Sequence, residues 1–184
     1  MTLVAALYVR ADSHYHELPG VDCWDVIRDA RRWPGGSPVI AHPPCRAWGR
    51  LRGMAKPRED EKELARIAVR QVRENGGVLE HPQASTLWAD QGLWNDGQGF
   101  TLPVSQYWFG HRAMKSTWLY IVGISPRALP AMPIVLGESS HVIATVHRKG
   151  MPGWRPAVSK EEREATPPAL AEWLVAVARL THVR

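Results

Sequence analysis

The chain has 184 residues, 45% of them hydrophobic, so it can bury a core and wholesale disorder is excluded. Its formal net charge of +5 at pH 7 is compatible with a nucleic-acid partner but does not require one. No apolar run approaches the roughly 20 residues that span a membrane, and two cysteines are too few for a disulfide framework. We therefore expect a reduced, cytoplasmic protein with no membrane partner, whose apolar start is a first strand rather than a signal peptide.

Four apolar runs predict β-strands. They span 3–9 (LVAALYV), 37–42 (SPVIAH), 76–81 (GGVLEH) and 116–124 (STWLYIVGI). Uninterrupted apolar runs are typical of parallel strands that are covered on both faces. Residues 59–75 predict a helix between the second and third runs, because apolar residues recur at helical spacing, acidic residues crowd the first turn and two glycines follow. Strand, helix and strand in this order indicate a βαβ unit and a parallel sheet.

The C-terminal third combines a loop-rich region with one clear helix. Residues 125–165 are rich in Pro and Gly and predict long loops, with a short strand near 141–146. Thr166 is the expected cap of a last helix, which carries an apolar stripe over 170–180. We expect one α/β domain over 1–184, a single Rossmann-like domain with a mostly parallel sheet and a C-terminal helix packed back on it.

Two chemically useful side chains fall at the ends of predicted strands. Cys45 follows the run 37–42, and Glu80 lies at the close of the run 76–81. Ligands of open parallel sheets bind outside the carboxyl ends of the strands. A thiolate is well suited to add to C6 of a pyrimidine, which activates C5, and a protonated carboxyl at N3 would stabilise the resulting charge. An ordinary thiol, with a pKa near ~8.5, needs positive surroundings to ionise. The candidates to supply them are Arg46, Arg50, His42 and His81.

Basic and aromatic residues are interleaved in two stretches. One runs from Arg46 to Arg58 and includes Trp48, and the other runs from His147 to Arg155 and includes Trp154. Nucleobases stack on aromatic faces while arginines meet phosphates, so this pattern suits a nucleotide surface. The pattern is equally typical of tryptophans in a core and arginines in solvent, and both interpretations stay open.

Four segments, taken in order, resemble elements of the C5-cytosine DNA methyltransferases. PVIAHPPCRAWG resembles the "PPC" element that carries the nucleophilic cysteine, and GGVLEHPQAS resembles the "ENV" or "ENP" element whose glutamate grips the target base. QYWFGHRAMKSTWLYIVG is similar to the element with a glutamine, a basic pair and a hydrophobic strand, in its phage-type form. ATPPALAEWLVAVARL is similar to the terminal helix that folds back on the cofactor domain.

The resemblance implies methyl transfer from S-adenosylmethionine to C5 of cytosine, in DNA or a pyrimidine nucleotide, in the host cytoplasm if the chain is phage-encoded. Cys45 would be the nucleophile, Glu80 would hold the base, and Arg112 or Lys115 would steady a phosphate or the cysteine. The substrate-binding candidates are His42, Pro44, Arg46, Trp48, Arg50, His81, Gln106 and Arg148. A target in a duplex would have to leave the base stack.

The chain departs from this family in two places. The family's glycine-rich F-x-G-x-G-G cofactor loop is missing, because no glycine follows the first strand before Gly20. Asp12 and Asp29 are the acidic candidates for contact with the ribose or adenine of the cofactor. The loop-rich residues 125–165 stand where the family has a large target-recognition region.

Two other functions fit the same residues. A protein that kept the base-binding half of such a fold could be a non-catalytic DNA-binding protein or decoy. A zinc-dependent base-modifying enzyme could draw ligands from His14, His16, His42, Cys23 and Cys45, although no His-x-Glu or Pro-Cys-x-x-Cys motif is present. Cys45 could also be a buried structural thiol in a rigid turn, and Cys23 is expected in the core.

Overall fold

The structure is a computed structural model that describes residues 2–94, 96–145 and 147–182. Its centre is a six-stranded sheet with the strand order β2-β1-β3-β4-β6-β5. The strands are β1 (Val4–Leu7), β2 (Val21–Trp24), β3 (Val39–Ala41), β4 (Gly77–Pro82), β5 (Gly99–Ser105) and β6 (Ser116–Val122). Strands β1 to β4 pair in parallel, whereas β6 runs antiparallel to both of its neighbours, β4 and β5. The sheet is therefore mostly parallel, with β6 reversed.

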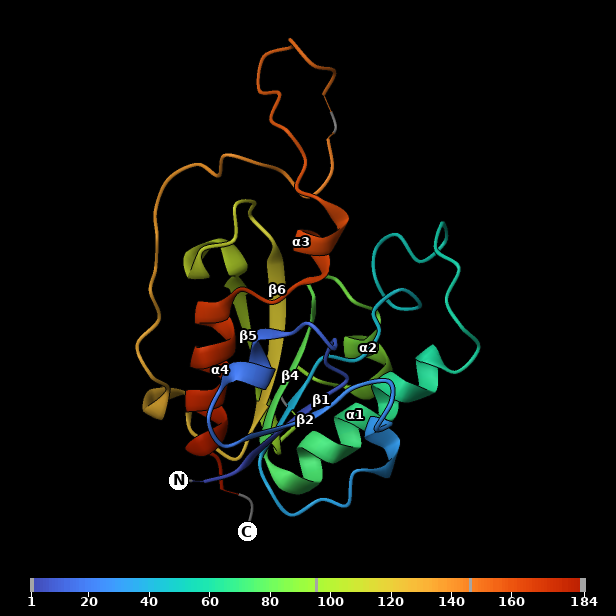
Figure 1. The fold of residues 1–184 in the computed structure, drawn as a ribbon, viewed down its shortest axis with the longest axis vertical. Helices are drawn as coiled ribbons and strands as arrows, with labels where there is room; N and C mark the ends of the chain where they lie inside the picture. The colour runs from blue at the N-terminus through green and yellow to red at the C-terminus, as the bar shows by residue number, and fades with distance from the viewer. Residues whose placement is uncertain (1, 95, 146, 183–184) are drawn as a thin grey trace.

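Helices cover both faces of the sheet (Figure 1). Helices α1 (Glu61–Asn75) and α2 (Leu87–Gln91) pack on one face, and α4 (Pro168–Arg179) packs on the other. Alternate strand residues supply the two cores: Ala6 and Ile40 face α4, and Ala5 and Val39 face α1. The remaining helices are short: α3 (Lys160–Glu164) and the 3-10 helices His14–Glu17, Ala30–Arg32, Gln106–Phe109 and Pro126–Ala128. The chain forms the expected Rossmann-like α/β fold.

A glycine fixes the close approach of β4 to β3. Helix α1 ends at Asn75, and Gly77 follows with a φ of 120° at the start of β4. A Cβ atom at Gly77 would lie 1.9 Å from the carbonyl oxygen of Val39. Only glycine combines this backbone conformation with such a close approach, so the sequence Gly76-Gly77 both ends the helix and lets the two strands pair.

The predicted strands and helices are confirmed, most with shorter bounds and β4 displaced by one residue. The structure adds strands β2 and β5 and helices α2 and α3, and α3 lies in the region 125–165 that was predicted as loops. The strand expected near 141–146 is wrong, because His141 and Val142 make only isolated bridges, to Ala113 and Ala157, and Val146 lies outside the described residues. Thr166 does not cap the last helix either. That helix begins at Pro168, where a missing backbone N–H costs little.

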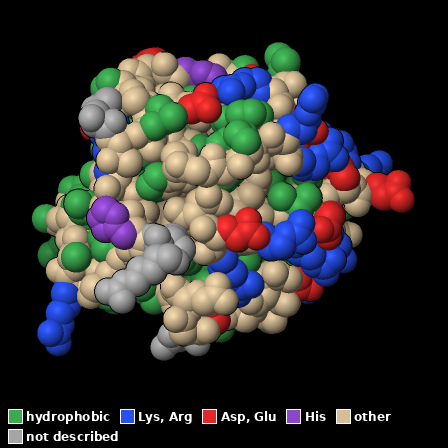
Figure 2. Space-filling model, turned by 90° about the horizontal axis from the view of Figure 1, so that it is seen from below, with side chains coloured by type: hydrophobic (Ala, Val, Ile, Leu, Met, Phe, Trp, Pro, Cys, Tyr) green, Lys and Arg blue, Asp and Glu red, His purple; other side chains and the backbone are tan. Residues whose placement is uncertain are grey.

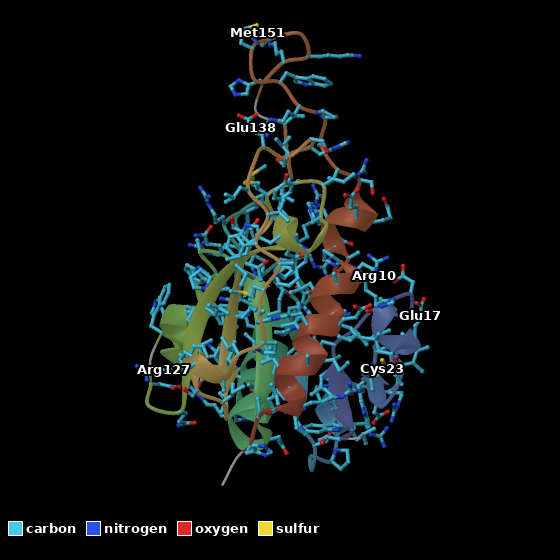
Figure 3. All side chains as sticks on the ribbon, turned by 90° about the vertical axis from the view of Figure 1, so that its left-hand side faces the viewer. Arg10, Glu17, Cys23, Arg127, Glu138 and Met151 are labelled. Atoms are coloured by element: carbon cyan, nitrogen blue, oxygen red, sulfur yellow. The ribbon has the colours of Figure 1, made fainter. Side chains whose placement is uncertain are left out.

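Two long connections extend away from the sheet. One covers residues 46–58, between β3 and α1, and the other covers 142–157, between β6 and α3. The bridge between Val142 and Ala157 closes the base of the second loop, which projects beyond α3 at the top of Figures 1 and 3, with Met151 at its tip. Among the described residues, no helix is long and apolar enough to cross a membrane.

Charged side chains on the α1 side of the molecule are largely paired. Figure 2 shows Lys and Arg interspersed with Asp and Glu on this side, seen from below. Arg66 lies 2.9 Å from Asp90, and Arg70 lies 3.6 Å from Glu63. These exposed pairs offset one another's charge, so the positive charge of the chain is not concentrated over α1.

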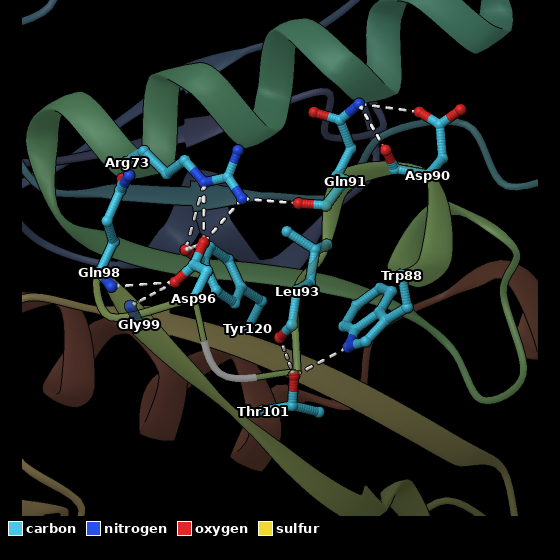
Figure 4. Close-up of polar contacts among 10 residues, drawn as sticks. All are labelled: Arg73, Trp88, Asp90, Gln91, Leu93, Asp96, Gln98, Gly99, Thr101 and Tyr120. Carbon is cyan, nitrogen blue, oxygen red and sulfur yellow. Dashed lines mark hydrogen bonds and ion pairs between the residues drawn. The ribbon is translucent and has the colours of Figure 1, made fainter.

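A partly buried ion pair ties the turn after α2 to α1 and β6 (Figure 4). Arg73 Nη2 lies 2.7 Å from Asp96 Oδ2 and donates to the carbonyl of Gln91 at 2.7 Å. The Tyr120 hydroxyl donates to the same Asp96 oxygen at 2.8 Å, and two backbone N–H groups of the next turn donate to Oδ1. Burial alone would raise the pKa of Asp96, but these donors and Arg73 lower it to about 2.

Replacing Asp96 with Asn should reveal this contribution to stability. A carboxyl whose pKa is lowered on folding stabilises the fold above its unfolded pKa, near ~4, and loses that effect as the pH falls towards 2. We expect Asp96→Asn to lower the free energy of unfolding by about 2 kcal/mol at pH 7, with a difference that shrinks between about pH 4 and 2 in urea titrations. Asp12→Asn, which removes an exposed carboxylate paired with Arg10, is the control and should change little. Equal losses in both variants would contradict the assignment.

Candidate active site

The carboxyl ends of β3 and β4 bring Cys45 and Glu80 to the same edge of the sheet. The two strands are parallel neighbours, and Ala41 of β3 pairs with Leu79 of β4. Glu80 is therefore the first β4 residue beyond this pairing, and Cys45 follows β3 after His42-Pro43-Pro44. The prediction that the thiol and the carboxylate occupy neighbouring strand ends is confirmed.

Glu80 is the centre of a hydrogen-bond network that draws on four segments. Its Oε2 lies 3.1 Å from His42 Nδ1, and its Oε1 accepts from Gln106 Nε2 and Thr117 Oγ1, each at 3.2 Å. Only 13% of the side chain is exposed. Burial would raise its pKa, but the hydrogen bond from His42 and the positive charge of Lys115 lower it to about 2. The structure thus favours an ionised carboxylate, where the sequence led us to expect a protonated one.

Cys45 carries its proton at neutral pH. Burial and the nearby charge of Glu80 raise the pKa of its thiol, and Lys115 opposes them. The positive group that acts on the sulfur is thus Lys115, whereas the sequence suggested Arg46, Arg50, His42 and His81. Burial lowers the pKa of Lys115, and its Nζ donates to the carbonyl of Ala165 at 3.1 Å. Cys45, Glu80 and Lys115 form one electrostatic cluster.

Backbone hydrogen bonds tie the turn at Cys45 to the loop after β4. The carbonyl of Cys45 accepts from the N–H groups of Trp48 at 3.0 Å and Gly49 at 2.8 Å. The carbonyl of Trp48 accepts from the N–H and the hydroxyl of Thr86, at 3.0 and 3.2 Å. The Trp48 ring is 3% exposed and lies under Arg66 of α1. Trp48 therefore anchors the turn, and its buried ring is no platform for stacking bases as the sequence had suggested.

His81 and Gln106 are buried, although the sequence placed them among substrate contacts. His81 Nδ1 lies 2.8 Å from Ser85 Oγ, which itself accepts the N–H of Leu87. The serine hydroxyl can donate to this ring nitrogen or accept from it, so the contact holds the ring in either tautomer. Burial lowers the pKa of His81 to about 4, so the ring is neutral. Gln106 is fully buried, and its amide nitrogen contacts Glu80 and Thr117 rather than solvent.

Two arginines assigned to the site instead pair with carboxylates elsewhere. Arg46 pairs with Glu61, a fully buried residue at the start of α1. Arg112 pairs with Glu162 of α3 and also contacts His141 at 3.2 Å. The structure therefore does not bring Arg46 or Arg112 into the cluster of Cys45, Glu80 and Lys115. Arg50 and Arg148, the other two, are exposed on the two projecting loops, at residues 46–58 and 142–157.

A cavity of about 450 Å³ reaches the turn before Cys45, where Pro44 lines it. It opens at the carboxyl ends of β1 and β2, where the chain crosses from β2 to β3 on the other side of β1. Such a switch in strand order is where open α/β sheets bind ligands, and the volume suits a small organic ligand. Asp29 lines the cavity, as do Tyr8, Asp25, Arg31, Pro44 and Leu64. Asp12 is exposed and pairs with Arg10, so it is not part of this lining.

Two residues of the cavity wall have strained backbones. Tyr8 has a φ of 60° and Asp29 a φ of 56°, the left-handed region that favours glycine. The sequence lacks the glycine-rich loop that follows the first strand in the family it resembles, and here Tyr8 takes a conformation that glycine adopts freely. Its hydroxyl donates to Gln71 of α1 at 3.0 Å, which holds it in place. Such strain of about 1–3 kcal/mol per residue is typical of functional sites.

The described residues contain no group of three or more His, Cys, Asp or Glu side chains that could hold a metal ion. The zinc interpretation therefore has no geometric support here. Cys23 lies in β2 and is buried, as expected, and burial raises the pKa of its thiol to about 11. Sequence reasoning missed Thr117, which donates to Glu80, and Tyr15, whose hydroxyl lies 3.0 Å from His42 Nε2. The only sequence feature that could have indicated Thr117 is its position in the apolar run 116–124. Tyr15 lies in a polar stretch whose sequence has no pattern that predicts a structural role.

Removing the Arg46 side chain should destabilise the fold, because Glu61 would keep a buried charge without its close partner. We expect Arg46→Ala to lower the free energy of unfolding by about 1–2 kcal/mol in urea titrations. Adding Glu61→Gln should recover part of the loss, because the buried charge is then gone. Arg50→Ala, on the same loop and exposed, is the matched control. Equal stability of the two single arginine variants would show that the pair contributes nothing.

No model of a protein family matches the chain, and no curated protein matches it.

Proposed function

We propose that the protein transfers a one-carbon group to C5 of a pyrimidine, with cytosine as the first candidate, through a covalent bond between Cys45 and C6. The observation that carries the proposal is the cluster of Cys45, Glu80 and Lys115 at adjacent strand ends, next to a cavity with which it shares the turn at Pro44. A thiol supplies the nucleophile and a recessed carboxylate holds the ring edge. The separate cavity accommodates the donor.

The protonation states in the cluster suit the first chemical step. The Cys45 thiol and the Glu80 carboxylate together hold one proton. As the Sγ–C6 bond forms, the ring π electrons shift onto N3. The proton that leaves the sulfur is passed by Glu80 to N3, so that no net charge builds up in the buried site. Lys115 lowers the energy of the thiolate during this transfer.

The second half of the reaction returns the protein to its starting state. After substitution at C5, solvent water takes the C5 proton, the C5–C6 double bond re-forms, the Sγ–C6 bond breaks and the sulfur leaves as thiolate. The N3 proton then goes back through Glu80, which restores the thiol and the carboxylate. Lys115 stabilises the leaving thiolate as it stabilised the attacking one.

The cavity fits S-adenosylmethionine, which when bound supplies an electrophilic methyl group. Carboxylates of Asp25 and Asp29 in its wall can accept hydrogen bonds from ribose hydroxyls and attract a cationic sulfonium group. Pro44 belongs to the wall and directly precedes Cys45, so a donor in the cavity lies next to the turn that carries the nucleophile. The strained Tyr8 takes the place of the family's glycine loop.

Nucleic acid is the proposed substrate, because the two projecting loops expose basic side chains, which can bind phosphates, and an apolar side chain, which can contact bases. Arg50 and Lys56 on the first loop, and Arg148 and Lys149 on the second, can meet phosphates. Exposed Met54 offers an apolar contact for bases. Glu80 is recessed, so the target base has to leave a duplex or be single-stranded.

A binding-only protein is the second candidate, and the raised pKa of Cys45 favours it. A thiol that stays protonated is a weak nucleophile unless substrate binding draws the proton away. Such a protein would hold a base at Glu80 without forming a bond to Cys45. The two functions differ in one observable, the covalent adduct.

An oligonucleotide that carries 5-fluorocytosine should trap the enzyme. Fluorine cannot leave C5 as a proton does, so the Sγ–C6 bond persists after methyl transfer. We expect intact-mass analysis to show a stable adduct at Cys45 when S-adenosylmethionine is present. Cys45→Ser should form none, and Glu80→Gln should form it about 100-fold more slowly because the amide cannot pass the proton to N3.

Cys23→Ser is the matched control, because it removes the other cysteine, which lies in the core, and should still form the adduct. The same mass analysis with the free 5-fluorinated nucleotide tests whether the polymer is required. If neither substrate gives an adduct, and Cys45→Ala binds DNA as well as the wild type does, the binding-only function is correct.

S-adenosylmethionine should raise the melting temperature of the protein, because a ligand that binds only the folded state stabilises it by mass action. Asp29→Asn should reduce the shift, since Asp29 lines the cavity, whereas Asp12→Asn should leave it unchanged. Thermal unfolding with and without the ligand measures both. The absence of a shift in the wild type would exclude this donor, and equal effects of the two variants would place its site elsewhere.

A further inference from the structure

A tyrosine from the first connection of the chain reaches the Glu80 network. Tyr15 lies in the 3-10 helix His14–Glu17, which follows β1, and it is fully buried. Its hydroxyl lies 3.0 Å from His42 Nε2, and His42 Nδ1 lies 3.1 Å from Glu80 Oε2. Tyr15, His42 and Glu80 therefore form a continuous hydrogen-bond chain, although they are separated by 27 and 38 positions in the sequence.

The direction of these hydrogen bonds follows from the chemistry of the three groups. An ionised carboxylate can only accept, so the His42 proton that faces it must be on Nδ1. In the tautomer with a single ring proton, on Nδ1, Nε2 has a lone pair and accepts the hydrogen of the Tyr15 hydroxyl. Every polar atom of the chain is satisfied in this arrangement, which buried groups require.

We propose that Tyr15 is a positioning residue for the base-binding carboxylate, because it fixes the tautomer and orientation of His42 and through His42 the orientation of Glu80. Both nitrogens of His42 are occupied, so His42 serves this chain instead of contacting the substrate as the sequence suggested. Gln106 and Thr117 hold the other carboxylate oxygen, Oε1. Tyr15 thus acts, through His42, on Oε2. The second lone pair of Oε2 is the one left to bind the edge of a pyrimidine ring.

The alternative role for Tyr15 is packing alone. Its ring lies against His42, with centroids 5.4 Å apart and the planes tilted by 46°. Tyr15→Phe separates the two roles, because phenylalanine keeps the ring and removes only the hydroxyl. Tyr107→Phe is the matched control, because its hydroxyl contacts a backbone carbonyl, that of Glu138, and lies outside the network.

The tautomer of His42 tests the proposal without any activity. In ¹⁵N spectra of histidine-labelled protein, assigned by the signals lost in His42→Asn, we expect Nδ1 to carry the proton and Nε2 to be a hydrogen-bonded acceptor. Tyr15→Phe should shift the Nε2 resonance to that of a free pyridine-type nitrogen, and Tyr107→Phe should not. A wild-type ring with its proton on Nε2, or an unchanged Nε2 resonance in Tyr15→Phe, would overturn the proposal.

A second, kinetic test rests on the proposed function. It measures the rate of adduct formation with the 5-fluorocytosine oligonucleotide. We expect Tyr15→Phe to slow the maximal rate about tenfold with little change in the concentration for half-maximal rate, because a misoriented carboxylate delivers its proton less well. In His42→Asn, whose amide nitrogen replaces Nδ1, adding Tyr15→Phe should have no further effect. If the two substitutions slowed adduct formation by independent factors that multiply in the double variant, the hydrogen-bond chain from Tyr15 to Glu80 would be contradicted. A wild type that forms no adduct would refute the proposed function, and the ¹⁵N spectra would still decide the role of Tyr15.

Discussion

The burial of the Glu80 carboxylate is the constraint on which the site depends. A charge taken out of water at the end of β4 requires donors on each side, and no single element can supply them. His42 comes from the segment after β3, Thr117 from β6 and Gln106 from the end of β5. The strand order that places β3 and β6 on either side of β4 is therefore also the order that satisfies this carboxylate.

The sequence predicts the centre of the sheet better than its edges. Strands β1, β3 and β4 are covered on both faces, so their uninterrupted apolar runs are visible in the sequence. Strands β2 and β5 lie at the two edges and are only partly buried, and β5 contains Pro103, which an edge strand tolerates. Neither has the pattern that identified the others. The neighbouring positions of Cys45 and Glu80 followed from the central strands alone.

Partners of charged groups could not be predicted, because they depend on distant segments. Arg46 and Arg112 were placed at the site by motif, but each pairs with a carboxylate that another element brings close. The protonation states of Cys45 and Glu80 likewise depend on burial and on Lys115, which no local pattern encodes. Residue types at strand ends are thus readable from the sequence, whereas their charge states require the fold.

The reversed direction of β6 decides which parts of the chain can change around the site. Because β6 runs against β4, its first residues, with Lys115 just before them, lie at the carboxyl edge of the other strands, and so does the end of β5. The connection 106–115 is thus a hairpin turn beside Glu80 and not a crossover that must cover a face of the sheet. Phe109 of this turn packs against Trp173 of α4 in the core, so the length of the turn is coupled to the packing of that face. A change in this turn would reach the core and Glu80 together, because Gln106 at its start donates to the Glu80 carboxylate.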